Sequence, residues 1–256
     1  MAEISEKMKK KAASPLFFAC AATLTIACFW GVVSVWMPGS LLRSFARTVL
    51  EFFHVKAALI RYGTWINVGR TLLLACGLPV SAALALIGLR LPHGDGCGVR
   101  LLKIALTVLS VLATAVMLLA EAFQVLEMIV ALAVYKDYTV ALRFLPPFLG
   151  ILLLYILWLT YAKSLNRVTR GLMRGVQTGV GFDCPLFPVV LSFLLALAAL
   201  AGTAFLPLRW PARLALGFLT LFFLLWGITL GNVRSILKKI REKTDRHENY
   251  MRTYMS

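Results

Sequence analysis

The stretch LFFACAATLTIACFWGVVSVWM, from Leu16 to Met37, decides the fold class of this protein. It runs for 22 residues without Asp, Glu, Lys or Arg, and about 20 apolar helical residues cover the roughly 30 Å hydrocarbon core of a bilayer. A cleavable signal peptide has an apolar region of only about 7–15 residues. We therefore expect a membrane-spanning helix here rather than a signal that is removed.

The composition of the whole chain also favours a membrane location. Of its 256 residues, 60% are hydrophobic and 15% are charged, whereas soluble globular proteins have about 45–50% apolar and about 25% charged residues. The 27 Lys and Arg against 11 Asp and Glu give a formal net charge of +16. In a membrane protein such an excess generally reports orientation, so we expect no nucleic-acid partner.

Six apolar stretches are long enough to cross a bilayer. We predict an all-α membrane protein, with a single integral-membrane domain over residues 1–256 built as a bundle of six transmembrane helices. An amphipathic interfacial helix is expected at 41–66, after the first span, and helical extensions are expected on the third, fourth and sixth spans. A basic cytoplasmic tail is expected at 234–256. The spans are predicted at 16–37, 72–91, 104–123, 144–162, 185–208 and 214–233.

The distribution of basic residues predicts how the chain is oriented. An even number of spans places both termini on one side, and with both inside, 18 of the 27 Lys and Arg residues fall in cytoplasmic segments. Because cytoplasmic loops carry the excess of Lys and Arg, we expect a multi-pass protein of the cell membrane with cytoplasmic N- and C-termini. No Asn begins an N-x-Ser/Thr sequon, which fits a bacterial membrane.

The segment 41–66 is too charged to span a membrane and too apolar for a solvated loop. On a helical wheel, Arg43, Arg47 and Arg61 fall on one narrow polar stripe, which we call the arginine stripe, while the large apolar residues lie elsewhere. One interpretation is an amphipathic helix that lies in the outer interface and meets lipid headgroups. The other is that the arginine stripe faces acidic groups of the same protein.

The third span carries the acidic groups that could meet the arginine stripe. Its apolar pattern continues from Ile104 to Val134, about 46 Å of helix, which exceeds the hydrocarbon thickness. Glu121, Gln124 and Glu127 form a polar stripe near its outer end. Three roles remain open for these side chains: a structural salt bridge with the arginine stripe, solvation at the membrane boundary, or an ion or substrate site.

Two lines of cations continue past the fourth and sixth spans. Their i, i+4, i+7 spacing places each line on one helix face, where like charges repel unless anions lie alongside. Anionic lipid headgroups of the inner leaflet are the expected anions, and the lines lack the interleaved aromatic residues that single-stranded nucleic acid would favour. The expected lipid-contacting residues are Lys163, Arg167, Arg170 and Arg174 after the fourth span, and Arg234, Lys238 and Arg241 after the sixth.

No complete catalytic motif is present. The chain contains no nucleophile elbow, H-E-x-x-H sequence or P-loop. His93, Asp95 and Cys97 alternate in an inner loop, and Asp183 and Cys184 lie in the next one, but H-x-D-x-C is no established zinc spacing. We therefore expect no cofactor or metal and favour a protein that is not an enzyme.

Small residues and prolines in the spans indicate how the helices pack. Gly227 and Gly231 form a G-x-x-x-G pattern on the sixth span, which favours close helix packing within the chain or between chains. Pro79 is expected to kink the second span. Pro146 and Pro147 are expected in the first turn of the fourth span, where proline is tolerated.

Two function classes follow from these features. The first is a structural, interaction or accessory membrane component that contacts anionic lipid, with a possible homo-oligomer or partner membrane protein. It is favoured by the small-residue faces, the basic inner lines and the missing catalytic motif. The alternative is a small-molecule transporter or a membrane subunit of one, favoured by the six spans, the kinked second span and the Glu121, Gln124 and Glu127 stripe.

Overall fold

The computed structural model describes residues 15–37, 67–133, 136, 138–178, 184–206 and 208–255. Within these residues every regular element is a helix. Residues 67–75 are also helical and are followed by a single turn residue, Cys76, three residues before Pro79; the kink expected at Pro79 stays a prediction. The helices are α2 (Pro15–Trp36), α5 (Gly77–Arg90), the short 3-10 helix η1 (Leu91–His93), α6 (Cys97–Ala133), α7 (Tyr138–Thr178), α8 (Phe187–Phe205) and α9 (Trp210–Met255).

The described residues contain six helical segments long and apolar enough to cross a membrane. Each of them overlaps one of the six predicted spans, so the prediction of an all-α bundle of six transmembrane helices is confirmed. The amphipathic segment at 41–66, with Arg43, Arg47 and Arg61, lies outside the described residues. The candidate spans are Pro15–Trp36, Asn67–His93, Cys97–Val130, Phe148–Thr178, Phe187–Phe205 and Trp210–Glu242.

The predicted helical extensions are present in the structure. The 37 residues of α6 and the 41 residues of α7 correspond to about 55 Å and about 60 Å of helix, far more than the hydrocarbon core requires. The helix α9 continues to Met255. One detail differs from the prediction: α7 begins at Tyr138, so Pro146 and Pro147 lie inside the helix and not in its first turn.

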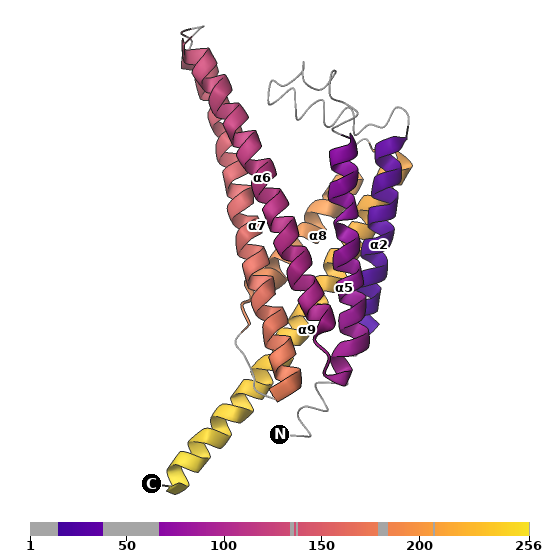
Figure 1. Ribbon diagram of the computed structural model, residues 1–256, viewed down its shortest axis with the longest axis vertical. Coiled ribbons are helices and arrows are strands. Elements are labelled where there is room, and N and C mark those ends of the chain that lie inside the picture. The colour runs from indigo at the N-terminus through magenta and orange to yellow at the C-terminus, as the bar shows by residue number, and fades with distance from the viewer. Residues whose placement is uncertain are drawn as a thin grey trace.

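The helices pack in the order α8, α9, α2, α5, α6 and α7, and α7 also contacts α8 and α9. Figure 1 shows that α6 and α7 lie side by side along their length, meet the other helices at one end, and lean away from α2 and α5 at the other. The start of α2 and the end of α9 lie at the end where the hairpin meets the bundle. Both termini of the described bundle thus lie on one side, as an even number of spans requires.

The core is concentrated at this same end. The buried apolar residues of α6 lie between Val99 and Leu106, and those of α7 between Tyr161 and Val176. Beyond these ranges the hairpin exposes large apolar side chains, among them Leu119 of α6 at 72% and Leu154 of α7 at 66%. In a six-span protein these side chains face lipid tails or a partner in the membrane.

Hydrogen bonds between side chains of different spans connect the helices of the bundle, because apolar contact alone does not fix how the helices are aligned. Trp226 of α9 donates its Nε1–H to the Tyr161 hydroxyl of α7 at 3.1 Å, and Tyr161 lies 3.2 Å from the Ser192 hydroxyl of α8. The hydroxyls of Thr25 in α2 and Ser81 in α5 are 2.6 Å apart. Such bonds between helices fix register in hydrocarbon, where burial of apolar surface does not distinguish protein from lipid.

Close helix contacts depend on glycine. A Cβ atom on Gly98 of α6 would lie 2.5 Å from the backbone nitrogen of Ile87 in α5. Cβ atoms on Gly227 and Gly231 of α9 would lie 3.1 Å and 3.9 Å from Phe193 and Val189 of α8. The G-x-x-x-G pattern therefore packs within the chain, which is one of the two outcomes that the sequence left open.

Candidate functional site

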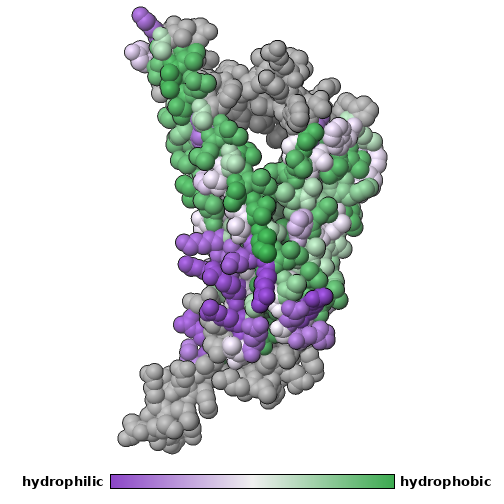
Figure 2. All heavy atoms as spheres, viewed as in Figure 1, coloured by the Kyte–Doolittle hydropathy of each residue, from purple (hydrophilic) through white to green (hydrophobic). Residues whose placement is uncertain are grey.

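One face of α7 carries a continuous line of cations beyond its membrane span. Lys163, Arg167, Arg170 and Arg174 are all exposed, while residues on the other side of the same helix segment are buried, among them Leu165 and Leu172. The sequence produces this arrangement because apolar residues on one helix face pack against α8 and α9, so the cations on the opposite face must point away. Figure 2 shows the hydrophilic side chains gathered below the apolar part of the molecule.

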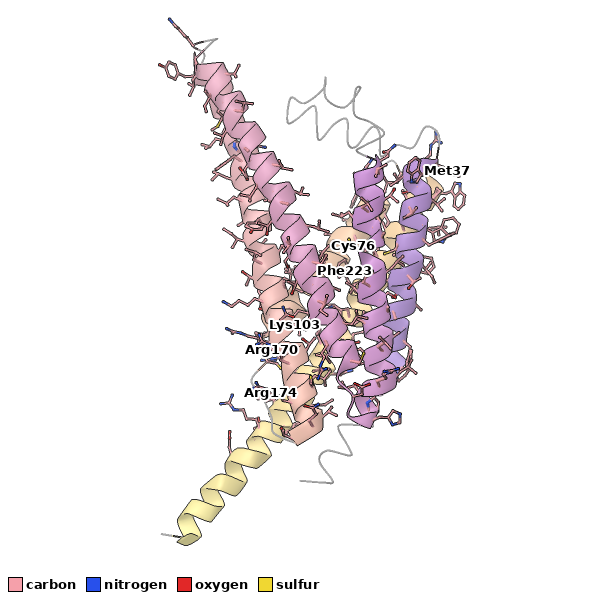
Figure 3. The ribbon with its side chains drawn as sticks, in the orientation of Figure 1. Met37, Cys76, Lys103, Arg170, Arg174 and Phe223 are labelled. Carbon is pink, nitrogen blue, oxygen red and sulfur yellow. The ribbon has the colours of Figure 1, made fainter. Side chains whose placement is uncertain are left out.

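The neighbouring helix α6 adds two more cations. Thr114 of α6 and Tyr155 of α7 have their hydroxyls 3.0 Å apart, which sets the register of this antiparallel pair. Counted from this contact, Lys103 lies level with residue 166 of α7, between Lys163 and Arg170 along the axis. Figure 3 shows Lys103 next to Arg170, with Arg174 further toward the end. We call the six exposed residues Arg100, Lys103, Lys163, Arg167, Arg170 and Arg174 the cationic face.

The cationic face has no acidic residue within its own helix segments. The sequences CGVRLLKIAL at 97–106 and YAKSLNRVTRGLMRGVQT at 161–178 contain neither Asp nor Glu. The nearby Asp95 forms an ion pair with Arg90 at 3.3 Å and accepts the Cys97 N–H at 2.9 Å. Its carboxylate therefore closes the turn before α6 and is already partnered.

The cations of α9 have a different environment. Arg234 is half-buried and donates its Nε–H to the Cys184 carbonyl at 3.0 Å. Lys238 lies 3.9 Å from Glu242, and Arg241 lies 3.8 Å from Asp245. The α9 line is thus partly neutralised by acids one turn away on its own helix, whereas the segment 161–178 of α7 contains no Asp or Glu.

The predicted polar stripe on α6 is only partly visible. Gln124 is 4% exposed, and its Oε1 has no hydrogen-bond partner among the described residues. Both carboxyl oxygens of Glu121 are also buried and without a partner there. The side chain of Glu127 and the arginine stripe lie outside the described residues, so a salt bridge between the two stripes stays a prediction.

Sequence reasoning missed two further buried polar atoms on α7. The Trp158 indole Nε1 and the Asn166 Oδ1 have no hydrogen-bond partner within the described part of the chain. It also missed the contact of Tyr161, Ser192 and Trp226, although each of these is an isolated polar group in an otherwise apolar span. The only available signal was this isolation, since buried polar groups normally find partners.

The alternating loop residues do not form a metal centre in the described structure. No group of three His, Cys, Asp or Glu side chains with metal-binding geometry occurs among the described residues. Cys184 is buried and Cys97 is exposed, and Asp183 lies outside the described residues.

Comparison of this chain with protein families, curated proteins and solved structures gives no match.

Proposed function

We propose that this protein is an accessory or structural component of the cell membrane, without a catalytic site, that holds anionic lipid against its cationic face. The observation that carries the proposal is the set of six exposed cations on the ends of α6 and α7 that meet the other helices, in helix segments without an acid. In this proposal the cationic face and both termini are cytoplasmic, in agreement with the excess of Lys and Arg in the corresponding segments.

The energetics favour lipid over solvation alone. Basic residues near an anionic membrane surface each contribute about 1 kcal/mol to the attraction, and clusters of 4–8 Lys or Arg next to a span are typical of binding to anionic headgroups. The same charges repel one another when no anion is present. Anionic lipid thus removes an unfavourable interaction and adds a favourable one.

The proposal predicts that lipid retention depends on α7 and not on α9. We expect a Lys163→Gln, Arg167→Gln and Arg170→Gln variant to lose about 3 kcal/mol of attraction, a roughly 100-fold weaker retention of anionic lipid. Native mass spectrometry of the protein purified in mild detergent measures the bound lipid.

The matched control changes Lys238, Lys239 and Arg241 of α9 to Gln, which removes the same charge at the same end of the bundle. We expect this variant to keep most of its lipid, because two of these cations already have acidic partners. Equal lipid loss in the two variants would contradict the proposal, since it would mean that only total charge matters.

A transport function is the second candidate, and the observation that favours it is the Glu121 and Gln124 pair. All three unpartnered atoms of this pair are hydrogen-bond acceptors, and buried acceptors without donors are costly. A transported cation or amine would supply the missing donor or positive charge.

This alternative predicts stabilisation by a cation. We expect the melting temperature in detergent to differ between Na⁺, K⁺ and choline salts at equal ionic strength, since a ligand that binds only the folded state raises stability. Glu121→Gln should abolish the difference, and Glu242→Gln on the exposed surface of α9 should preserve it. If the unmodified protein had the same melting temperature in all three salts, Glu121 and Gln124 would not form a cation site.

A further inference from the structure

The helices α6 and α7 pack in a register that two separate contacts define. The hydroxyls of Thr114 and Tyr155 are 3.0 Å apart, and a Cβ atom on Gly96, directly before α6, would lie 2.7 Å from the Met173 Cε. On each chain segment the two contacts are 18 residues, or five full turns, apart. The same face of each helix therefore meets its partner along this length, and we call the line where they meet the seam.

Cations lie along one side of the seam. Arg100 of α6 lies about 40° around its helix from the seam, and Arg170 and Lys163 of α7 lie about 60° and 80° around theirs. Lys103 of α6 lies within about 20° of the seam itself. All four side chains are exposed, whereas the buried apolar residues of both helices lie on the other side and pack against the bundle. The four cations therefore share the open side of the seam.

Lys103 and Arg170 lie closest to each other across the seam. In the register of the two helices, Lys103 is level with Asn166, one turn from Arg170. The Nε–H of Arg170 donates to the Asn166 carbonyl at 3.1 Å, which turns the guanidinium back toward the level of Lys103. Figure 3 shows the two cations next to each other. The other guanidinium N–H groups and the Lys103 ammonium are donors that one anion between them can engage.

Apolar side chains continue the open side of the seam beyond the cations. Ile104 directly follows Lys103, and Val111 lies two turns further along α6. On α7, Leu159 and Leu152 lie at about 40° and 60° from the seam on this same side. All four apolar side chains are exposed, and we call them the apolar strip. Cations at the end of an apolar strip match a molecule with an anionic head and a hydrocarbon chain.

We propose that one anionic phospholipid binds in the seam, with its phosphate between Lys103 and Arg170 and an acyl chain along the apolar strip. This inference rests on the proposed function and reduces its charged surface to one site for one lipid. The phosphate neutralises cations of both helices, which repel one another across the seam in its absence. A lipid phosphate fits better than a free one, because the site directly adjoins the apolar run that begins at Ile104.

The first test measures lipid retention by native mass spectrometry of the full-length protein in mild detergent. The probes are phosphatidylglycerol, phosphatidylcholine and inorganic phosphate. We expect one tightly held phosphatidylglycerol per chain. Lys103→Gln with Arg170→Gln should weaken its retention about 30-fold, because two cation contacts are lost. The matched control, Lys238→Gln with Lys239→Gln on the exposed surface of α9, removes the same charge and should keep the lipid.

The second test fills the apolar strip without changing any charge. Val111→Trp places a large side chain where the acyl chain lies, and we expect about tenfold weaker retention of phosphatidylglycerol. Val116→Trp is the matched control, because Val116 is also exposed on α6 and lies on the side turned away from α7. This control should retain the lipid as the unmodified protein does. Gel filtration with circular dichroism confirms that each variant is folded.

The possible outcomes separate this inference from the proposed function. Equal retention in Val111→Trp and Val116→Trp, or in the Lys103 and Arg170 variant and its α9 control, would overturn the seam site while leaving anionic lipid binding intact. Displacement of phosphatidylglycerol by inorganic phosphate at equal concentration would show that the site takes the anion alone, which also overturns the inference. No preference of the unmodified protein for phosphatidylglycerol over phosphatidylcholine would contradict the proposed function as well.

Discussion

Gly98→Ala is expected to destabilise the protein by about 3 kcal/mol or more. A Cβ atom at this position would lie 2.5 Å from the Ile87 nitrogen and 2.8 Å from the Leu86 carbonyl carbon. Both atoms are backbone atoms, so no side chain can rotate to make room, and α5 and α6 must separate. Overpacking ordinarily costs about 1–3 kcal/mol, and loss of a helix contact adds to it. Thermal unfolding in detergent, followed by tryptophan fluorescence, measures the effect.

Gly217→Ala provides the control for Gly98→Ala. No atom lies within 4 Å of a Cβ built on Gly217 in α9, and Ala is favoured over Gly in a helix by about 1 kcal/mol. We therefore expect an unchanged or slightly higher melting temperature. If Gly98→Ala behaved like this control, the close crossing of α5 and α6 would be wrong.

Trp226→Ala is expected to lower the free energy of unfolding by about 3 kcal/mol, because it leaves a cavity where three helices meet. The indole is 4% exposed, stacks on Phe222 at a centroid distance of 6.4 Å, and meets the edge of Phe17 in α2 at the same distance. It also donates a hydrogen bond to Tyr161 of α7. Truncation of a large aromatic side chain in a packed core typically costs about 3–5 kcal/mol, and the lower value applies here because apolar burial gives little driving force in lipid.

Two further variants separate packing from hydrogen bonding at Trp226. Trp226→Phe keeps an aromatic ring and loses the N–H donor. We therefore expect it to lower the free energy of unfolding by about 1 kcal/mol. Trp210→Ala removes an indole that is 56% exposed and contacts Trp30 at 5.2 Å, and we expect a clearly smaller loss than at Trp226. Equal unfolding temperatures for Trp226→Ala and Trp210→Ala would show that α2, α7 and α9 do not meet at Trp226.

Much of the fold could be predicted because the bilayer imposes simple rules. An apolar run such as Leu16–Met37 must be helical in hydrocarbon, where every backbone N–H and C=O needs an internal partner. The overlong third span was visible from its uninterrupted apolar pattern, and α6 extends to Ala133. The start of α7 at Tyr138 was missed, because Pro146 and Pro147 suggested the first turn of a helix and in fact lie within it.

The residues of the candidate site could be predicted from the sequence, but their arrangement in space could not. The sequence by itself determined six membrane spans, their helical extensions and the two cationic lines, since these follow from composition and helical periodicity. The acids one turn from Lys238 and Arg241 follow from the i, i+4 spacing of the sequence. Only the tertiary structure showed that α7 packs its apolar face on the bundle and presents its cations beside Lys103 of α6. Local spacing fixes which residues share a helix face, but the charge that a face presents depends on neighbours brought together from distant parts of the chain.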